Sequence, residues 1–172
     1  MKKILFTILL AFFGVISANA QEIDSLQIKS DTISIERLVA RIDKLQYDYD
    51  FLYCRSQLDR LLSELENMML NIRIEYNSIM SAYFNHSKPD VDYYISCKNL
   101  YKSNKENFDL KKLNASVVKS FVSLKISFSN FSEVDTDILN TSLTMLEKNL
   151  TFIEKLFDSY QNVIDLYKDR IN

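Results

Sequence analysis

The chain has one glycine among its 172 residues, Gly14, and one proline, Pro89. Barrels, sandwiches and doubly wound sheets need residues that accept positive φ angles at tight turns and phosphate-binding loops, and glycine does so without strain. Long helices have no such need. The near-absence of glycine therefore predicts an all-α protein made of long helices with few turns.

The first twenty residues have the three parts of a secretory signal peptide. Lys2 and Lys3 form a positive start, an apolar run extends from Ile4 to Ile16, and residues 18–20 form a small-x-small cleavage motif. We expect cleavage between Ala20 and Gln21. The run is shorter than the roughly 20 residues of a spanning helix, so an uncleaved anchor is the less favoured alternative. The sequence thus predicts an exported bacterial protein, located in the periplasm, at the cell surface or outside the cell.

The charge that remains after cleavage excludes some partners. Residues 1–20 carry two lysines and no acid, so 19 basic and 23 acidic residues follow them, a net charge of -4. A mildly acidic chain of interspersed signs has no electrostatic attraction to nucleic acid or anionic lipid. No later stretch is long and apolar enough to cross a bilayer. We therefore expect no nucleic-acid partner and no membrane span after signal cleavage.

Residues 21–32 are polar without a sustained apolar period, which predicts a flexible leader before a single helical-bundle domain at 33–172. A first helix is expected from about 34 to 84. Its apolar residues alternate steps of three and four at Ile35, Leu38, Ile42, Leu45, Tyr49 and Leu52. They resume in another phase at Cys54, Leu58, Leu61, Leu65, Met68, Ile72, Tyr76, Ile79 and Tyr83. Because neither glycine nor proline marks the shift, it indicates a stutter or mild bend in one helix.

Residues 85–94 contain the only histidine, His86, and are interpreted as a corner between helices. Pro89 suits a first helical turn, and Ser87 with Asp90 resembles a capping box. The next helix carries Tyr94, Cys97, Tyr101 and Phe108 on one side. A polar stretch then precedes a second apolar set in a different phase, which consists of Leu110, Leu113, Val117, Leu124, Phe128 and Phe131. This shift predicts a kink or a break near 103–109.

Residues 122–129 alternate apolar and polar side chains like a strand, but a lone strand has no partner, so a helix is favoured there. Ser132 or Asp135 is expected to cap the last helix. Its apolar residues alternate steps of four and three throughout: Leu139, Leu143, Leu146, Leu150, Ile153, Phe157, Tyr160, Ile164, Tyr167 and Ile171. The predicted fold is an antiparallel bundle of three long helices with coiled-coil-like seams. A four-helix bundle, with a true turn near 103–109, is the alternative.

The sequence predicts neither a catalytic nor a cofactor or metal site. There is no Glu-x-x-His pair for a di-iron centre, no Cys-x-x-Cys-His for haem, and no glycine loop for phosphate. Cys54 and Cys97 would lie about 35 Å apart along a hairpin with its corner near residue 87. A disulfide needs Cα atoms within about 7 Å, so both thiols are expected to be free. We therefore expect a protein that is not an enzyme.

The first helix is longer than its expected partners, and its unmatched apolar side chains need a covering surface. Tyrosines are frequent at interfaces, because the ring buries area while the hydroxyl stays wet. Rings lying along the rim of the bundle are the alternative explanation. The candidate interaction surface, for an unknown protein partner or for self-association, is Ile35, Leu38, Ile42, Tyr47, Tyr49 and Tyr53.

Two other functions remain open at this point. Cavities between helices can hold an apolar small molecule, so a binder or carrier is one alternative. A periplasmic holdase-type chaperone is the other; the size resembles that of known helical chaperones, but those are commonly basic. The layout of signal, polar leader, SIERLVARIDKLQYDYDFLY at 34–53 and three helical arms, with an R-x-D-K-L-x-x-D segment at 41–48, resembles small uncharacterised secreted helical proteins of Gram-negative bacteria. That resemblance implies no function and no site.

Overall fold

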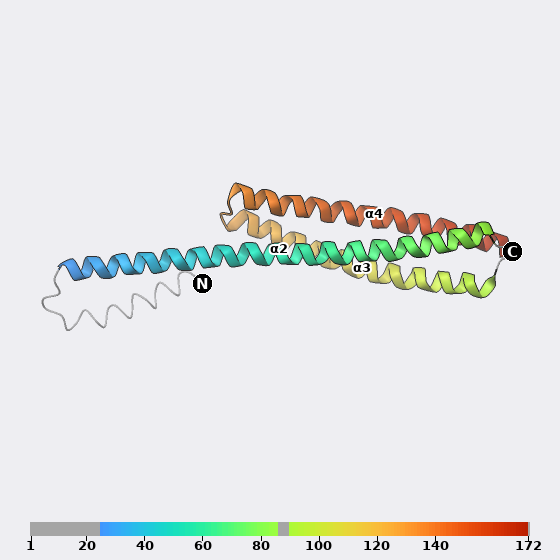
Figure 1. Cartoon of the computed structure of the whole chain (residues 1–172), viewed down its shortest axis with the longest axis horizontal. Coiled ribbons are helices and arrows are strands. Elements are labelled where there is room, and N and C mark those ends of the chain that lie inside the picture. Colours follow the sequence, from blue (N-terminus) through green and yellow to red (C-terminus); the bar gives the residue numbers. More distant parts are fainter. Residues whose placement is uncertain (1–24, 86–89, 172) are drawn as a thin grey trace. The chain divides into compact units, whose positions relative to one another are not determined.

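The computed structural model describes residues 25–85 and 90–171, which form three helices and, within these ranges, no strand. They are α2 (Ser25–Asn85), α3 (Val91–Phe128) and α4 (Glu133–Ile171), labelled in Figure 1. The predicted all-α class and three-helix count are confirmed, and 122–128 is helical rather than a strand. The predicted signal peptide and the predicted cleavage site at Ala20 and Gln21 lie outside the described residues.

The chain divides into two compact units, Met1–Gln46 (unit 1) and Tyr47–Asn172 (unit 2), whereas the sequence predicted one domain from residue 33. Helix α2 begins at Ser25, so residues 25–32 are helical and not part of a leader. The physical reason is that extending an existing helix by one residue is easy compared with nucleating one, and no glycine or proline stops it. From Ser34 to Gln46 every side chain except that of Ile35 is exposed, so this part of α2 has no core of its own.

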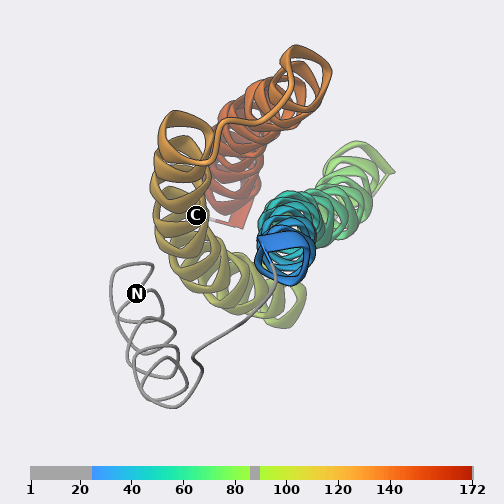
Figure 2. The same cartoon turned by 90° about the vertical axis from the view of Figure 1, so that its left-hand side faces the viewer.

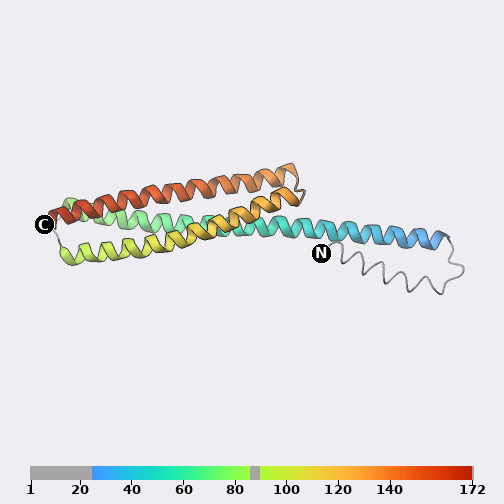
Figure 3. The same cartoon turned by 180° about the vertical axis from the view of Figure 1, so that it is seen from behind.

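Unit 2 is the helical bundle, in which α3 is antiparallel to both other helices. Ion pairs fix the register: Asp50 of α2 pairs with Lys125, and Glu64 further along α2 pairs with Lys111. Helix α4 passes α3 in the opposite direction, as Figure 3 shows. In the end-on view of Figure 2, the three helices of this unit surround a common interior.

Two long predicted apolar rows, one on α2 and one on α4, form much of this interior. All ten residues predicted for the last helix are buried or half-buried, and so are all nine predicted from Cys54 to Tyr83. The phase shift after Leu52 has a simple cause. In unit 2, Tyr49 and Leu52 lie on the exposed side of α2, while Cys54 and Leu58 lie on the buried side. The shift separates two faces of one uninterrupted helix, so the chain needs no loop there.

Helix α3 corrects the sequence prediction. It is continuous across 103–109, so the predicted break is absent and the four-helix alternative is wrong. The predicted core residues Leu110, Leu113, Val117, Leu124 and Phe128 are exposed. The buried row instead continues the phase of Tyr101 and Phe108, and its further members are Ala115, Val118 and Val122.

The helix ends are defined by caps. The Asp90 carboxylate accepts a hydrogen bond from the Tyr93 amide at 3.1 Å, so Asp90 is the N-cap of α3, whereas the capping-box prediction gave it the position three residues after the cap. His86, Ser87 and Pro89 lie outside the described residues. Before α4, the predicted cap Ser132 accepts from the Asp135 amide at 3.1 Å. The same connection contains Asn130 with a φ of 47°, a left-handed conformation that asparagine tolerates better than most residues.

Candidate interaction surfaces

The candidate surface predicted from sequence divides between the two units. In unit 1, Leu38 and Ile42 are 56% and 52% exposed, whereas Ile35 is half-buried. Leu45, three residues after Ile42 in the same row, is also exposed. Exposed aliphatic side chains at this spacing form a stripe along one side of a helix.

Tyr47 belongs to the interior contacts of unit 2. Its hydroxyl donates to the Asp135 carboxylate and accepts from the Ser132 amide at 2.9 Å. Its ring packs edge-on against Phe131, with ring centroids 5.5 Å apart. Tyr47 therefore ties α2 to the corner between α3 and α4, which removes it from the candidate surface.

Tyr49 and Tyr53 have the exposure that an interaction surface requires. They are 63% and 43% exposed, and their rings stack with centroids 6.0 Å apart. Tyr53 also contacts Phe121 of α3 edge-on at 5.6 Å. This tyrosine pair thus presents rigid aromatic area to solvent beside α3.

A larger apolar surface on α3 was missed by the sequence analysis as a surface, because its members were assigned to the core. We call it the outer row; its residues are 57–79% exposed and comprise Leu110, Leu113, Val117, Leu124 and Phe128. Phe121 is four residues after Val117 and three before Leu124, so it lies on the same side of the helix. Through its contact with Tyr53, the outer row is continuous with the tyrosine pair.

The signal that distinguishes the two faces of α3 is a set of polar residues in its buried row. Asn104, Lys111 and Lys125 continue the three-four spacing of Tyr101, Phe108, Ala115, Val118 and Val122. Each has an acidic partner on α2. Asn104 donates to both Glu75 oxygens, at 2.9 and 2.7 Å; Lys111 pairs with Glu64 at 2.7 Å, and Lys125 pairs with Asp50 at 2.9 Å. The polar members obscure the apolar period of this face.

A cluster of tyrosines and one thiol surrounds Glu75 within unit 2. Burial is the main cause that raises the pKa of Cys97 above its usual range, and it raises the pKa of Tyr93 to about 12. Burial also raises the pKa of Tyr160, whose hydroxyl has no hydrogen-bond partner among the described residues. A thiol with a raised pKa is protonated at neutral pH and is a poor nucleophile. Cys54 is likewise buried and free, with a pKa raised mainly by burial.

Glu75 gives the fold a testable pH dependence. Burial raises its pKa from the usual 4.5, and the hydrogen bonds from Asn104 only partly oppose that rise. The folded state therefore holds this proton more tightly than the unfolded state. As the pH falls through the raised folded pKa towards 4.5, the contribution of Glu75 to the free energy of unfolding increases. We expect the free energy of unfolding of wild type, measured in urea titrations, to rise relative to that of Glu75→Gln as the pH falls through this window. A difference between the two free energies that does not change with pH would contradict the prediction.

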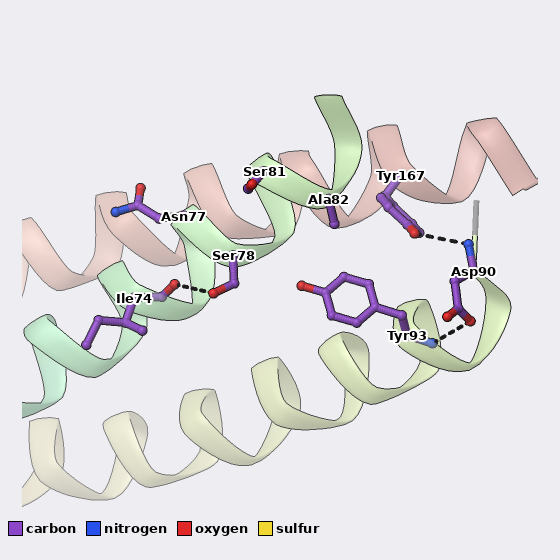
Figure 4. A pocket seen from close by; sticks show the side chains of 8 residues that line it. All are labelled: Ile74, Asn77, Ser78, Ser81, Ala82, Asp90, Tyr93 and Tyr167. Carbon is purple, nitrogen blue, oxygen red and sulfur yellow. Dashed lines mark hydrogen bonds between the residues drawn. The ribbon is translucent and has the colours of Figure 1, made fainter. Parts of the chain in front are cut away.

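The corner between α2 and α3 contains an open groove of about 640 Å³ (Figure 4). Several of its polar groups already have partners. The Asp90 amide donates to the Tyr167 hydroxyl at 3.0 Å, and Ser78 donates to the Ile74 carbonyl at 3.0 Å. Few polar groups are thus left to orient a ligand. The lining residues are Ile74, Asn77, Ser78, Ser81, Ala82, Asp90, Tyr93 and Tyr167.

Over residues 25–85 and 90–171, no group of three His, Cys, Asp or Glu side chains could hold a metal ion. In the same ranges no helix combines the length and the apolar character needed to span a membrane. The chain matches no protein-family model, no curated protein and no solved structure. Its function is therefore inferred from its own surfaces.

Proposed function

We propose that this chain is an exported, non-enzymatic helical-bundle protein that binds another protein through the outer row and the tyrosine pair. The observation that carries the proposal is the outer row: five large apolar side chains along about five turns of α3, all more than half exposed. A contiguous exposed apolar patch is costly in water and is typical of a protein contact site. The protonated state of both thiols fits a role without nucleophilic chemistry.

The tyrosine pair fits the proposed contact in a second way. Tyrosine is enriched at interfaces because its rigid ring buries much area at a low entropic cost, while its hydroxyl tolerates water. Tyr49 and Tyr53 of α2 offer such rings in a stack, and Tyr53 contacts Phe121 of α3 beside the outer row. A partner that packs apolar side chains on Leu124 and Phe128 would meet these hydroxyls at its rim.

The proposal is tested by site-specific photo-crosslinking in the export compartment of the native cell. A photoreactive residue replaces Leu113 in the outer row, and the matched control carries it at Asp158, an exposed position on α4. We expect one discrete protein adduct at Leu113, none at Asp158, and loss of the adduct when Leu124→Glu is added. Leu124 is exposed, so this charge should leave the bundle folded, as checked by circular dichroism.

Other outcomes would overturn the proposal. Equal labelling at both positions would mean that the outer row binds nothing specifically. Adducts with many unfolded exported chains would indicate a holdase instead. A copurified apolar small molecule in native mass spectrometry, with no adduct at Leu113, would indicate a carrier.

A further inference from the structure

A second exposed row runs along α2. We call it the α2 seam; it consists of Ile35, Leu38, Ile42, Leu45, Tyr49 and Leu52. The first four belong to unit 1 and the last two to unit 2, and helix α2 runs through both. Its steps of three, four, three, four and three are those of the a and d positions of a coiled coil. All members except Ile35 are more than half exposed.

We propose that two copies of this chain pair through the α2 seam as an antiparallel coiled coil related by a two-fold axis. The proposal goes beyond the proposed function, because it assigns self-association to a surface that shares no residue with the outer row and only Tyr49 with the tyrosine pair. In an antiparallel coiled coil, each a residue must face a d residue of the other helix. A two-fold axis between residues 43 and 44 meets this condition in every layer.

The proposed register gives three kinds of layer. Ile42 faces Leu45 of the second copy in the two central layers, and Leu38 faces the second copy's Tyr49 in the next two. Ile35 faces the second copy's Leu52 at the ends. An isologous contact of this type repeats each pair twice and closes at two copies. No charged residue occupies the seam, and the hydroxyl of Tyr49 is its one polar group, so every layer buries apolar area.

Charges beside the α2 seam favour an antiparallel over a parallel arrangement of the two α2 helices. The flanking g positions are Arg41 and Asp48, which are exposed and take part in none of the ion pairs described within the chain. In the antiparallel register each Arg41 faces Asp48 of the second copy, which gives two symmetric ion pairs. In a parallel pair, Arg41 would face Gln46 and Asp48 would face Tyr53, so no ion pair would form. Charge complementarity therefore favours the antiparallel pair of copies.

The buried side of the same helix leaves the seam available. Within unit 2, α2 contacts the other helices through Asp50, Phe51 and Cys54, whereas Tyr49 and Leu52 are 63% and 61% exposed. A second copy can thus cover these two residues without displacing any contact of the bundle. In unit 1 the exposed Val39 lies beside the seam and would face Gln46 of the second copy, which adds apolar area at the edge.

The first test is the oligomeric state of the purified full chain in sedimentation velocity runs over a range of concentrations. Wild type is expected to form a reversible dimer. Ile42→Glu places two carboxylates in the central layers and is expected to weaken the dimer by more than about 100-fold. The matched control, Leu113→Glu, adds the same charge to the outer row and should leave the dimer unchanged. A wild-type chain that is monomeric at its highest soluble concentration would overturn the proposal.

A charge exchange tests the register. Arg41→Asp and Asp48→Arg each turn two attractive pairs into two repulsive ones, and each is expected to weaken its own dimer by about tenfold. An equimolar mixture of the two variants restores two opposite-charge pairs in the heterodimer, and the double variant restores them in the homodimer. A mixture as weak as its components would contradict the antiparallel register.

Cysteine pairs distinguish direction independently of charge. Leu38→Cys and Tyr49→Cys chains, mixed and oxidised, are expected to form the mixed disulfide, because these positions face each other. Two copies of position 38 lie about 16 Å apart along the axis, too far for a disulfide. Predominance of the Leu38→Cys homodisulfide would indicate a parallel pair and refute the proposal. Wild type, whose two thiols are buried, is the background control.

The two proposals can fail separately. If Ile42→Glu is monomeric but still gives the adduct at Leu113, both are supported, and partner binding at the outer row does not require the dimer. If the wild type is monomeric and the adduct persists, self-association is wrong and the proposed function stands. If the dimer forms but no adduct appears, partner binding through the outer row is wrong and the dimer stands.

Discussion

Replacing Phe108 by alanine is expected to lower the free energy of unfolding by about 3–5 kcal/mol, the range typical of a buried phenylalanine. Phe108 is 0% exposed, and its ring packs against Phe157 of α4 with centroids 5.5 Å apart. Removal of the Phe108 ring would leave a cavity between α3 and α4, because the other contacts of these helices prevent them from closing the gap. The matched variant Leu110→Ala should change the stability by less than about 0.5 kcal/mol, because Leu110 is 69% exposed.

Urea unfolding, monitored by circular dichroism, measures both losses of stability. If the slope of the unfolding free energy against urea concentration is the same in both variants as in wild type, the free energies can be compared directly. The comparison is sharp because the two residues are two positions apart on the same helix, so they have nearly the same local sequence. A larger loss for Leu110→Ala than for Phe108→Ala would mean that the outer row, and not the Phe108 row, faces the core. The outer row could then not be the surface that binds a partner.

The local spacing of apolar residues was sufficient to predict the buried faces of α4 and of α2 from Cys54 onward, because nearly every buried position there is apolar. It was insufficient for α3. The buried row of α3 includes Asn104, Lys111 and Lys125, which look like surface residues to any local measure. Their partners are 29, 47 and 75 residues away in the sequence. The burial of a polar residue depends on its partner, so only the folded arrangement identifies the correct face.

The same limit applied to Tyr47. Its sequence environment, QYDYDFLY, places three tyrosines within seven residues and offers no means of ranking them. The structure separates them by what α2 meets on each side: Tyr47 reaches the corner at Ser132 and Asp135, and Tyr49 and Tyr53 do not. The α2 seam, in contrast, was visible from spacing alone. What the sequence could not reveal was that the bundle leaves that seam uncovered.

Lys125→Met is expected to destabilise the bundle by about 2 kcal/mol, because it leaves the carboxylate of Asp50 without its ammonium partner. Asp50 is 9% exposed, and Lys125 reaches it from α3 at 2.9 Å. The expected loss is smaller than for a fully buried pair, since the Lys125 side chain is still 31% exposed. Lys102→Met is the matched control; its pair with Glu106 is exposed on both sides, and its loss should cost less than about 0.5 kcal/mol.

The double variant Asp50→Leu with Lys125→Met separates the attraction between the two charges from the cost of burying the Asp50 carboxylate without the Lys125 ammonium group. Two apolar side chains of similar size can replace a buried ion pair with little or no loss, so we expect the double variant to recover most of the stability lost by Lys125→Met. Urea titrations of wild type, Asp50→Leu, Lys125→Met and the double variant give the four free energies of unfolding of this double-mutant cycle. If the losses of the single variants simply add, the pair is not coupled, and the register between α2 and α3 must then be set by the Lys111–Glu64 pair, the Asn104–Glu75 hydrogen bonds and the apolar core.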